Sequence, residues 1–61
     1  MMAKASYVWR AGFKTRLAAE LALVADLEEG EVSEAENPIV RSYLRNCQAP
    51  RKFLIQLSHD F

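Results

Sequence analysis

The clearest pattern in the chain is an apolar stripe at helical spacing between residues 13 and 29. With about 100° between successive residues, the large apolar side chains of this segment fall within an arc of roughly 160°. The members of the stripe are Phe13, Leu17, Leu21, Leu23, Val24 and Leu27. Alanines between them favour helix, and Gly30 follows at the position of a left-handed C-cap. The pattern predicts a helix over residues 14–29 with one apolar face.

A second amphipathic segment covers residues 38–48 and is also predicted to be a helix. Pro38 disfavours helical geometry at the preceding residue, so Asn37 becomes the N-cap and Pro38 the first helical residue. A competing start exists at Ser33, which forms a capping-box pattern with Glu36, but the start at Asn37 is preferred. The apolar face of this helix would hold Ile39, Val40, Tyr43, Leu44 and Cys47, and the polar face Arg41, Arg45 and Gln48.

The C-terminal segment fits two periodicities. As a helix over residues 51–59 it leaves Ile55 outside the apolar face, and as a strand it leaves Leu54 on the polar face. The helix is preferred because Pro50 stands at its start.

Alternation in the N-terminal segment over residues 5–13 places one set of side chains on one face, Tyr7, Trp9, Ala11 and Phe13, and the other set on the opposite face, Val8, Arg10 and Gly12. That alternation predicts an extended arm or a short strand. The predicted fold class is therefore mainly α: one small domain over residues 1–61, with residues 1–13 as the arm or strand and residues 14–61 as a helical core.

The chain is short for the amount of apolar side chain that it carries. At 61 residues it buries only about 60% of the surface that its unfolded form exposes, while 51% of its residues are hydrophobic. Cys47 is the only cysteine, so no internal disulfide can form, and His59 is the only histidine. Small domains without such staples complete their cores by association. We therefore expect a homo-oligomer, foremost a dimer, or docking on a larger protein partner.

Charge is segregated into blocks although the net charge is zero. Residues 1–19 carry +4, residues 20–36 carry −7, and residues 37–61 carry +3. Such blocks pair with a complementary surface or form a solvated segment. Exposed pairs contribute about 0–1 kcal/mol each, so we expect these charges to select orientation and partner rather than to stabilise the fold.

No set of residues predicts catalysis, a cofactor or a metal. A Cys47–His59 nucleophile and base would join a cysteine on the predicted apolar helix face to a histidine at the chain end, and a buried structural cysteine is favoured instead. The two glycines, Gly12 and Gly30, form no phosphate-binding loop. The expectation is a protein that is not an enzyme and has no cofactor.

The longest apolar run, residues 17–27, is too short and is interrupted by Glu20, so no membrane span is predicted. A single cysteine is typical of cytoplasmic or other reducing compartments. The basic first nineteen residues also resemble an organelle import sequence in composition, although a basic arm of a cytosolic protein is preferred.

Two kinds of side chain are candidates for contact with a protein partner. Aromatic residues dominate interface energetics, so the expected anchors are Trp9, Phe13, Tyr43 and Phe53. Acidic residues in the last turn of the first helix oppose its macrodipole. These residues are Asp26, Glu28 and Glu29, and we expect them to face a basic surface of this chain or of a partner.

Glu20 falls inside the apolar stripe, where a carboxylate requires a partner or a position at the margin. Arg16 lies one turn earlier and is the local candidate. The alternative is an arginine of another chain, in which case Glu20 would fix the register of association.

The predicted order of an extended segment, a helix, a turn and a second helix over residues 5–49 resembles that of ribbon-helix-helix repressors. The resemblance implies a dimeric DNA-binding regulator with residues 5–12 as a strand entering the major groove. Its nucleic-acid contacts would be Ser6, Val8, Arg10, Asn37, Arg41 and Arg45. Because the acidic segment before Asn37 would repel DNA, a non-enzymatic interaction module, such as an accessory subunit or adaptor, is the preferred function.

Overall fold

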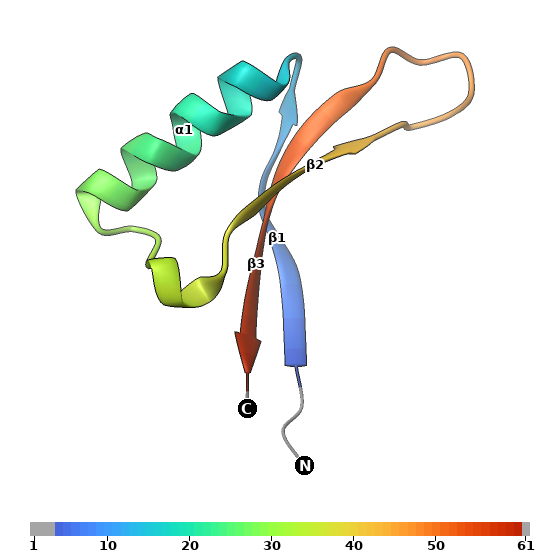
Figure 1. Cartoon of the computed structure of the whole chain (residues 1–61). Coiled ribbons are helices and arrows are strands. Elements are labelled where there is room, and N and C mark those ends of the chain that lie inside the picture. Colours follow the sequence, from blue (N-terminus) through green and yellow to red (C-terminus); the bar gives the residue numbers. More distant parts are fainter. Residues whose placement is uncertain (1–3, 61) are drawn as a thin grey trace.

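The computed structural model describes residues 4–60 and the side chains of residues 5–58. Strand β1 (Lys4–Phe13) leads into helix α1 (Arg16–Glu29), and a 3-10 turn η1 (Glu34–Glu36) precedes strands β2 (Ile39–Tyr43) and β3 (Lys52–Asp60). The described residues form one three-stranded sheet in the order β1-β3-β2, with both pairings antiparallel. Strands β1 and β2 thus run parallel on either side of β3, and α1 lies against one face of the sheet (Figure 1).

The expectation of a mainly helical fold is wrong. The predicted helices over residues 38–48 and 51–59 are replaced by β2 and β3, which form an antiparallel hairpin. In β3, Ile55 and Leu57 are fully buried beneath α1, so the period of two in this segment defines its packed face. A central strand between two partners satisfies its backbone on both edges, and an isolated terminal helix has no equivalent source of stability.

The turn before β2 also differs from the expectation. Ser33 and Glu36 form the capping box, with the Ser33 backbone N–H donating to Glu36 Oε1 at 3.0 Å. The turn ends at Asn37, whose φ of 50° lies in the left-handed region, so Asn37 is not an N-cap. Pro38 then precedes an edge strand, where its missing N–H removes no sheet hydrogen bond.

Helix α1 confirms the helix predicted over residues 14–29 and its Gly30 cap, although it begins two residues later, at Arg16. The Thr15 side chain accepts from the Ala18 backbone N–H at 3.0 Å, and Gly30 ends the helix with a φ of 80°. The face against the sheet consists of Ala19, Ala22, Leu23, Asp26 and Leu27. The hydrophobic core of the described residues holds Ala19, Val32, Ile55 and Leu57 as its fully packed members. The predicted apolar stripe is therefore split, and only Leu23 and Leu27 of its helical members pack inward.

The β2–β3 loop is held together locally. The Asn46 side chain accepts from the backbone N–H groups of Gln48 at 2.9 Å and Ala49 at 2.8 Å, which is an Asx-type turn. Cys47 lies in this loop and is exposed, so the expectation of a buried cysteine on a helix face is wrong. The absence of a second helix after α1 within residues 4–60 also removes the element order on which the likeness to ribbon-helix-helix repressors rested.

Candidate interaction surfaces

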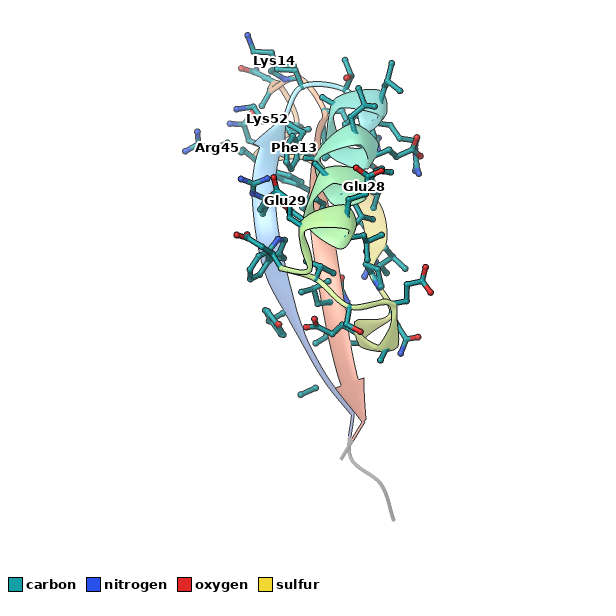
Figure 2. The ribbon with its side chains drawn as sticks, turned by 90° about the vertical axis from the view of Figure 1, so that its left-hand side faces the viewer. Phe13, Lys14, Glu28, Glu29, Arg45 and Lys52 are labelled. Carbon is teal, nitrogen blue, oxygen red and sulfur yellow. The ribbon has the colours of Figure 1, made fainter. Side chains whose placement is uncertain are left out.

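The outer face of α1 is the most prominent apolar surface of the described residues. Leu17, Leu21 and Val24 are 63%, 61% and 49% exposed. Their spacing of four and then three residues aligns them along one side of the helix, opposite the side on which Ala19 and Asp26 are buried. We call these three residues the outer stripe. Figure 2 looks onto α1 from the side away from the sheet and shows Glu28 near its C-terminal end.

Charges at the two ends of α1 oppose its macrodipole. Lys14 and Arg16 lie at the N-terminal end, and the first turn contains no acidic residue. Glu28 and Glu29 lie in the last turn, which contains no basic residue. All four side chains are exposed. A helix is stabilised by acids at its start and bases at its end, so both sets of charges destabilise α1.

The sheet face turned away from α1 is a second exposed surface. Val8 is 53% exposed and Ile39 is 45% exposed, and Gln56 pairs with both in the register of the sheet. The Arg41 guanidinium donates to Gln56 Oε1 at 3.2 Å. We call this surface, formed by Ser6, Val8, Ile39, Arg41, Tyr43, Lys52, Leu54 and Gln56, the open sheet face. It is mixed in polarity and basic.

Asp26 is the one buried charged side chain in the described part of the chain, with 4% exposure. Its Oδ2 accepts from Trp9 Nε1 at 3.0 Å and from Arg10 Nη1 at 3.4 Å. The Asp26 carbonyl accepts from the backbone N–H groups of Glu31 at 2.9 Å and Val32 at 3.3 Å. This residue therefore joins β1 to the C-terminal half of α1 and to the loop that follows.

An irregularity in β1 makes this junction possible. The register against β3 shifts between Val8 and Arg10, so that Trp9 is an extra residue in its strand. A bulge of this kind changes which face the next side chain occupies. Both Trp9 and Arg10 thereby reach Asp26 on the helix side.

The structure distributes the predicted partner-binding residues over several places. Trp9 and Asp26 contact each other. Phe13 and Phe53 are half-buried against the core, with the Arg16 guanidinium 5.8 Å from the Phe53 ring centre. Tyr43 lies half-buried on the open sheet face, whereas Glu28 and Glu29 are exposed on α1.

Glu20 is exposed at the margin of the outer stripe. Its Oε1 lies 3.9 Å from Arg16 Nη1 one turn earlier. The side chains of Arg16 and Glu20 are 57% and 51% exposed, so this ion pair is screened by solvent and contributes little to stability.

The residues named for the nucleic-acid alternative do not form one surface. Ser6, Val8 and Arg41 share the open sheet face, while Arg10 points to the helix side because of the bulge at Trp9. Asn37 lies in the turn before β2, and Arg45 is exposed in the β2–β3 loop.

Sequence reasoning missed the outer stripe as a separate surface. It merged the outward Leu17, Leu21 and Val24 with the inward Leu23 and Leu27 into one arc. The signal that could have separated them lies on the opposite side of the helix, where Ala19, Ala22 and Asp26 form a band of small or hydrogen-bonding residues. This band is the side that packs on the sheet.

Tyr7 extends the helix side of the sheet beyond α1. Its hydroxyl donates to Glu36 Oε2 at 3.2 Å. Partial desolvation raises the pKa of the Tyr7 phenol above its ordinary value, and the hydrogen bond to Glu36 and the negative charge of that carboxylate add to the increase. The contact attaches η1 to β1.

Residues 4–60 enclose no pocket, and the described side chains include no cluster of three or more that could hold a metal ion. Every buried side-chain nitrogen or oxygen among them has a hydrogen-bond partner. No helix in this part of the chain is long and apolar enough to cross a membrane. The chain matches no protein-family model, no curated protein and no solved structure.

Proposed function

We propose that this protein is a non-enzymatic interaction module, a small accessory subunit or adaptor that completes its apolar burial against another protein chain. One observation carries the proposal: α1 is apolar on two opposite sides, and the sheet covers only one of them. Amphipathic surface helices present a polar face to solvent, whereas α1 presents Leu17, Leu21 and Val24 there.

The energetics support a partner for this surface. Burial of a leucine or valine side chain is worth about 1.5–3 kcal/mol relative to exposure. The fully packed core within residues 4–60 is small, with Ile55, Leu57 and Val32 as its largest side chains. Covering the outer stripe would therefore add a substantial fraction to the apolar burial of the domain.

The proposed compartment is reducing, such as the cytoplasm. Cys47 is exposed and forms no disulfide, and an exposed thiol in an oxidising compartment is prone to intermolecular oxidation.

Site-specific photo-crosslinking in the organism that encodes the chain tests the proposal. A photoreactive residue at position 21 lies in the outer stripe, and one at position 48 in the exposed β2–β3 loop is the matched control. We expect a discrete crosslinked protein product from position 21 and none from position 48. The product should disappear when Leu17→Glu is added, because the charge disrupts the same surface. Absence of a product from position 21 and from position 8 on the open sheet face would contradict the proposal.

A further inference from the structure

We propose that the outer stripe of α1 binds the same stripe of a second copy, with the two helices antiparallel about a two-fold axis near Leu21. This inference rests on the proposed function and deepens it by naming the partner.

The spacing of the outer stripe is that of a helix-pairing seam. Leu17, Leu21 and Val24 follow one another at intervals of four and three residues, and Glu28 continues the series. Alternating intervals of this kind keep apolar side chains facing a neighbouring helix. The flanking Ala18 and Ala25 are half-buried and exposed, respectively, and their small side chains permit close approach of a second helix. Such a seam suits a second copy, since each helix supplies the same pattern.

Charge complementarity selects the antiparallel orientation. A two-fold axis at Leu21 places the first turn of α1 in one copy beside the last turn of α1 in the other, and Lys14 directly precedes that first turn. Lys14, just before one α1, then lies near the acidic end of the other α1, with Glu28 and Glu29, while Arg16 stays close to Phe53 and Glu20 of its own chain. Figure 2 shows Lys14 beyond one end of α1 and the two glutamates near its other end.

The same arrangement resolves the opposition between these charges and the macrodipole. In an antiparallel pair the acids of one copy lie beside the positive N-terminal end of the other helix, and the bases lie beside its negative C-terminal end. A parallel pair would place like charges together at both ends.

The open sheet face is a weaker candidate for self-association. Two-fold pairing of that face would bring Arg41 and Lys52 of one copy against the same basic residues of the other. Like charges across an interface disfavour association. The helix surface has opposite charges at its two ends, so of these two surfaces it is the one that becomes self-complementary when one copy is reversed.

The dimer is expected to be weak and concentration-dependent. A single helix of 14 residues gives an interface at the small end of the range for specific complexes, and we expect a dissociation constant on the order of 10 μM.

Sedimentation equilibrium of the full chain over a wide range of concentration tests the surface. We expect a monomer–dimer equilibrium. Leu21→Gln should raise the dissociation constant roughly a hundredfold, because two leucines meet at the axis. The matched control Ile39→Gln, an exposed aliphatic residue on the open sheet face, should leave it unchanged. A dimer lost with Ile39→Gln and kept with Leu21→Gln would overturn the inference.

Charge reversal tests the orientation. Lys14→Glu and Glu28→Lys should each raise the dissociation constant by about tenfold, because each homodimer then pairs like charges twice. Each single variant should also have an unchanged or higher Tm at concentrations where it is monomeric, since its new charge agrees with the macrodipole. This combination separates weakened pairing from weakened folding. The double variant Lys14→Glu/Glu28→Lys should dimerise as the parent does, and failure of that restoration would exclude the antiparallel pair.

Failure of this inference differs from failure of the proposed function. In the photo-crosslinking experiment, a product from position 21 at twice the chain mass supports the second copy. A heavier product, together with a monomer in sedimentation, overturns the second copy and leaves the interaction module standing. No product from position 21 and none from position 8 on the open sheet face would overturn both.

Discussion

Helix α1 has two apolar sides, and the side with the smaller residues is the one that packs. The inward side holds Ala19, Ala22 and Asp26 with Leu23 and Leu27 at its margins. The outward side holds the larger and more exposed Leu17, Leu21 and Val24. Total hydrophobicity alone would have placed the outer stripe against the sheet.

Close approach explains the difference. Alanines allow the helix backbone to lie near the sheet, so that Ile55 and Leu57 of β3 fill the space between the two layers. Asp26 then accepts hydrogen bonds from Trp9 and Arg10 on β1. A leucine at position 26 would leave both donors without this acceptor. Geometry and hydrogen bonding thus choose the packed side, and the larger apolar residues remain available for a partner.

The largest test of this comparison replaces a leucine of β3 that is buried beneath the inward side of α1 and a leucine on the outward side of α1. Leu57→Ala should lower the free energy of unfolding by about 2–5 kcal/mol, because it removes fully buried methyl and methylene groups. Leu21→Ala should change it by less than about 0.5 kcal/mol, because the side chain is exposed. Urea unfolding at concentrations where the chain is monomeric measures both. Similar losses for the two variants would mean that the outer stripe packs within the monomer.

A second test enlarges an alanine on each side. Ala19 is fully buried, so Ala19→Leu should cost about 1–3 kcal/mol through overpacking. Ala25 is exposed on the same helix, so Ala25→Leu should leave the monomer within about 0.5 kcal/mol of the parent. Thermal unfolding of the two variants gives the comparison. If Ala19→Leu were tolerated equally well, close approach would not be the reason that α1 packs on its alanine side.

The third test removes the polar contact of the inward side. Asp26→Ala should cost about 1–2 kcal/mol, because Trp9 Nε1 and the Arg10 guanidinium lose their acceptor. The ion-pair share is small, since the Arg10 side chain is 51% exposed. A double-mutant cycle with Trp9→Phe isolates the Trp9–Asp26 hydrogen bond. A coupling free energy near zero would show that this bond does not stabilise the packed side.

The fourth test concerns the acidic end of the helix. Glu28→Gln and Glu29→Gln together should raise the free energy of unfolding of the monomer by a few tenths of a kcal/mol per residue, because both acids oppose the macrodipole. The same double variant should weaken dimerisation, which sedimentation measures in parallel. A stabilised monomer with unchanged association would leave these two acids as a solvated helix end.

Local signals in the sequence were sufficient for α1. Its apolar spacing and the left-handed Gly30 cap depend on residues within a few turns of one another. The strands β2 and β3 could not be predicted in the same way, because their short apolar runs fit both periods. Their choice of strand depends on partners far along the chain: Ile55 of β3 pairs with Val40 on one side and with Arg10 on the other.

The candidate surface was predictable only in part for a related reason. The exposed acids Glu28 and Glu29 and the Arg16–Glu20 contact follow from helix geometry. Helix geometry does not determine which side of α1 the sheet covers, because that depends on β3. The bulge at Trp9 is likewise not predicted by any pattern in the sequence, and it moves Arg10 to the helix side of the sheet.

The smallest test concerns Tyr7, which lies on the helix side of the sheet and contacts Glu36 beyond the end of α1. Its pKa is raised by partial desolvation and by Glu36, so folding favours the neutral phenol. This contribution to stability is complete below the unfolded pKa of about 10 and is lost as pH rises through the higher folded value. Tyr7→Phe should therefore reduce the fall in stability above about pH 10, as measured by urea unfolding, and Tyr43→Phe on the open sheet face is the matched control. An unchanged alkaline slope in Tyr7→Phe would mean that the packed side ends with α1.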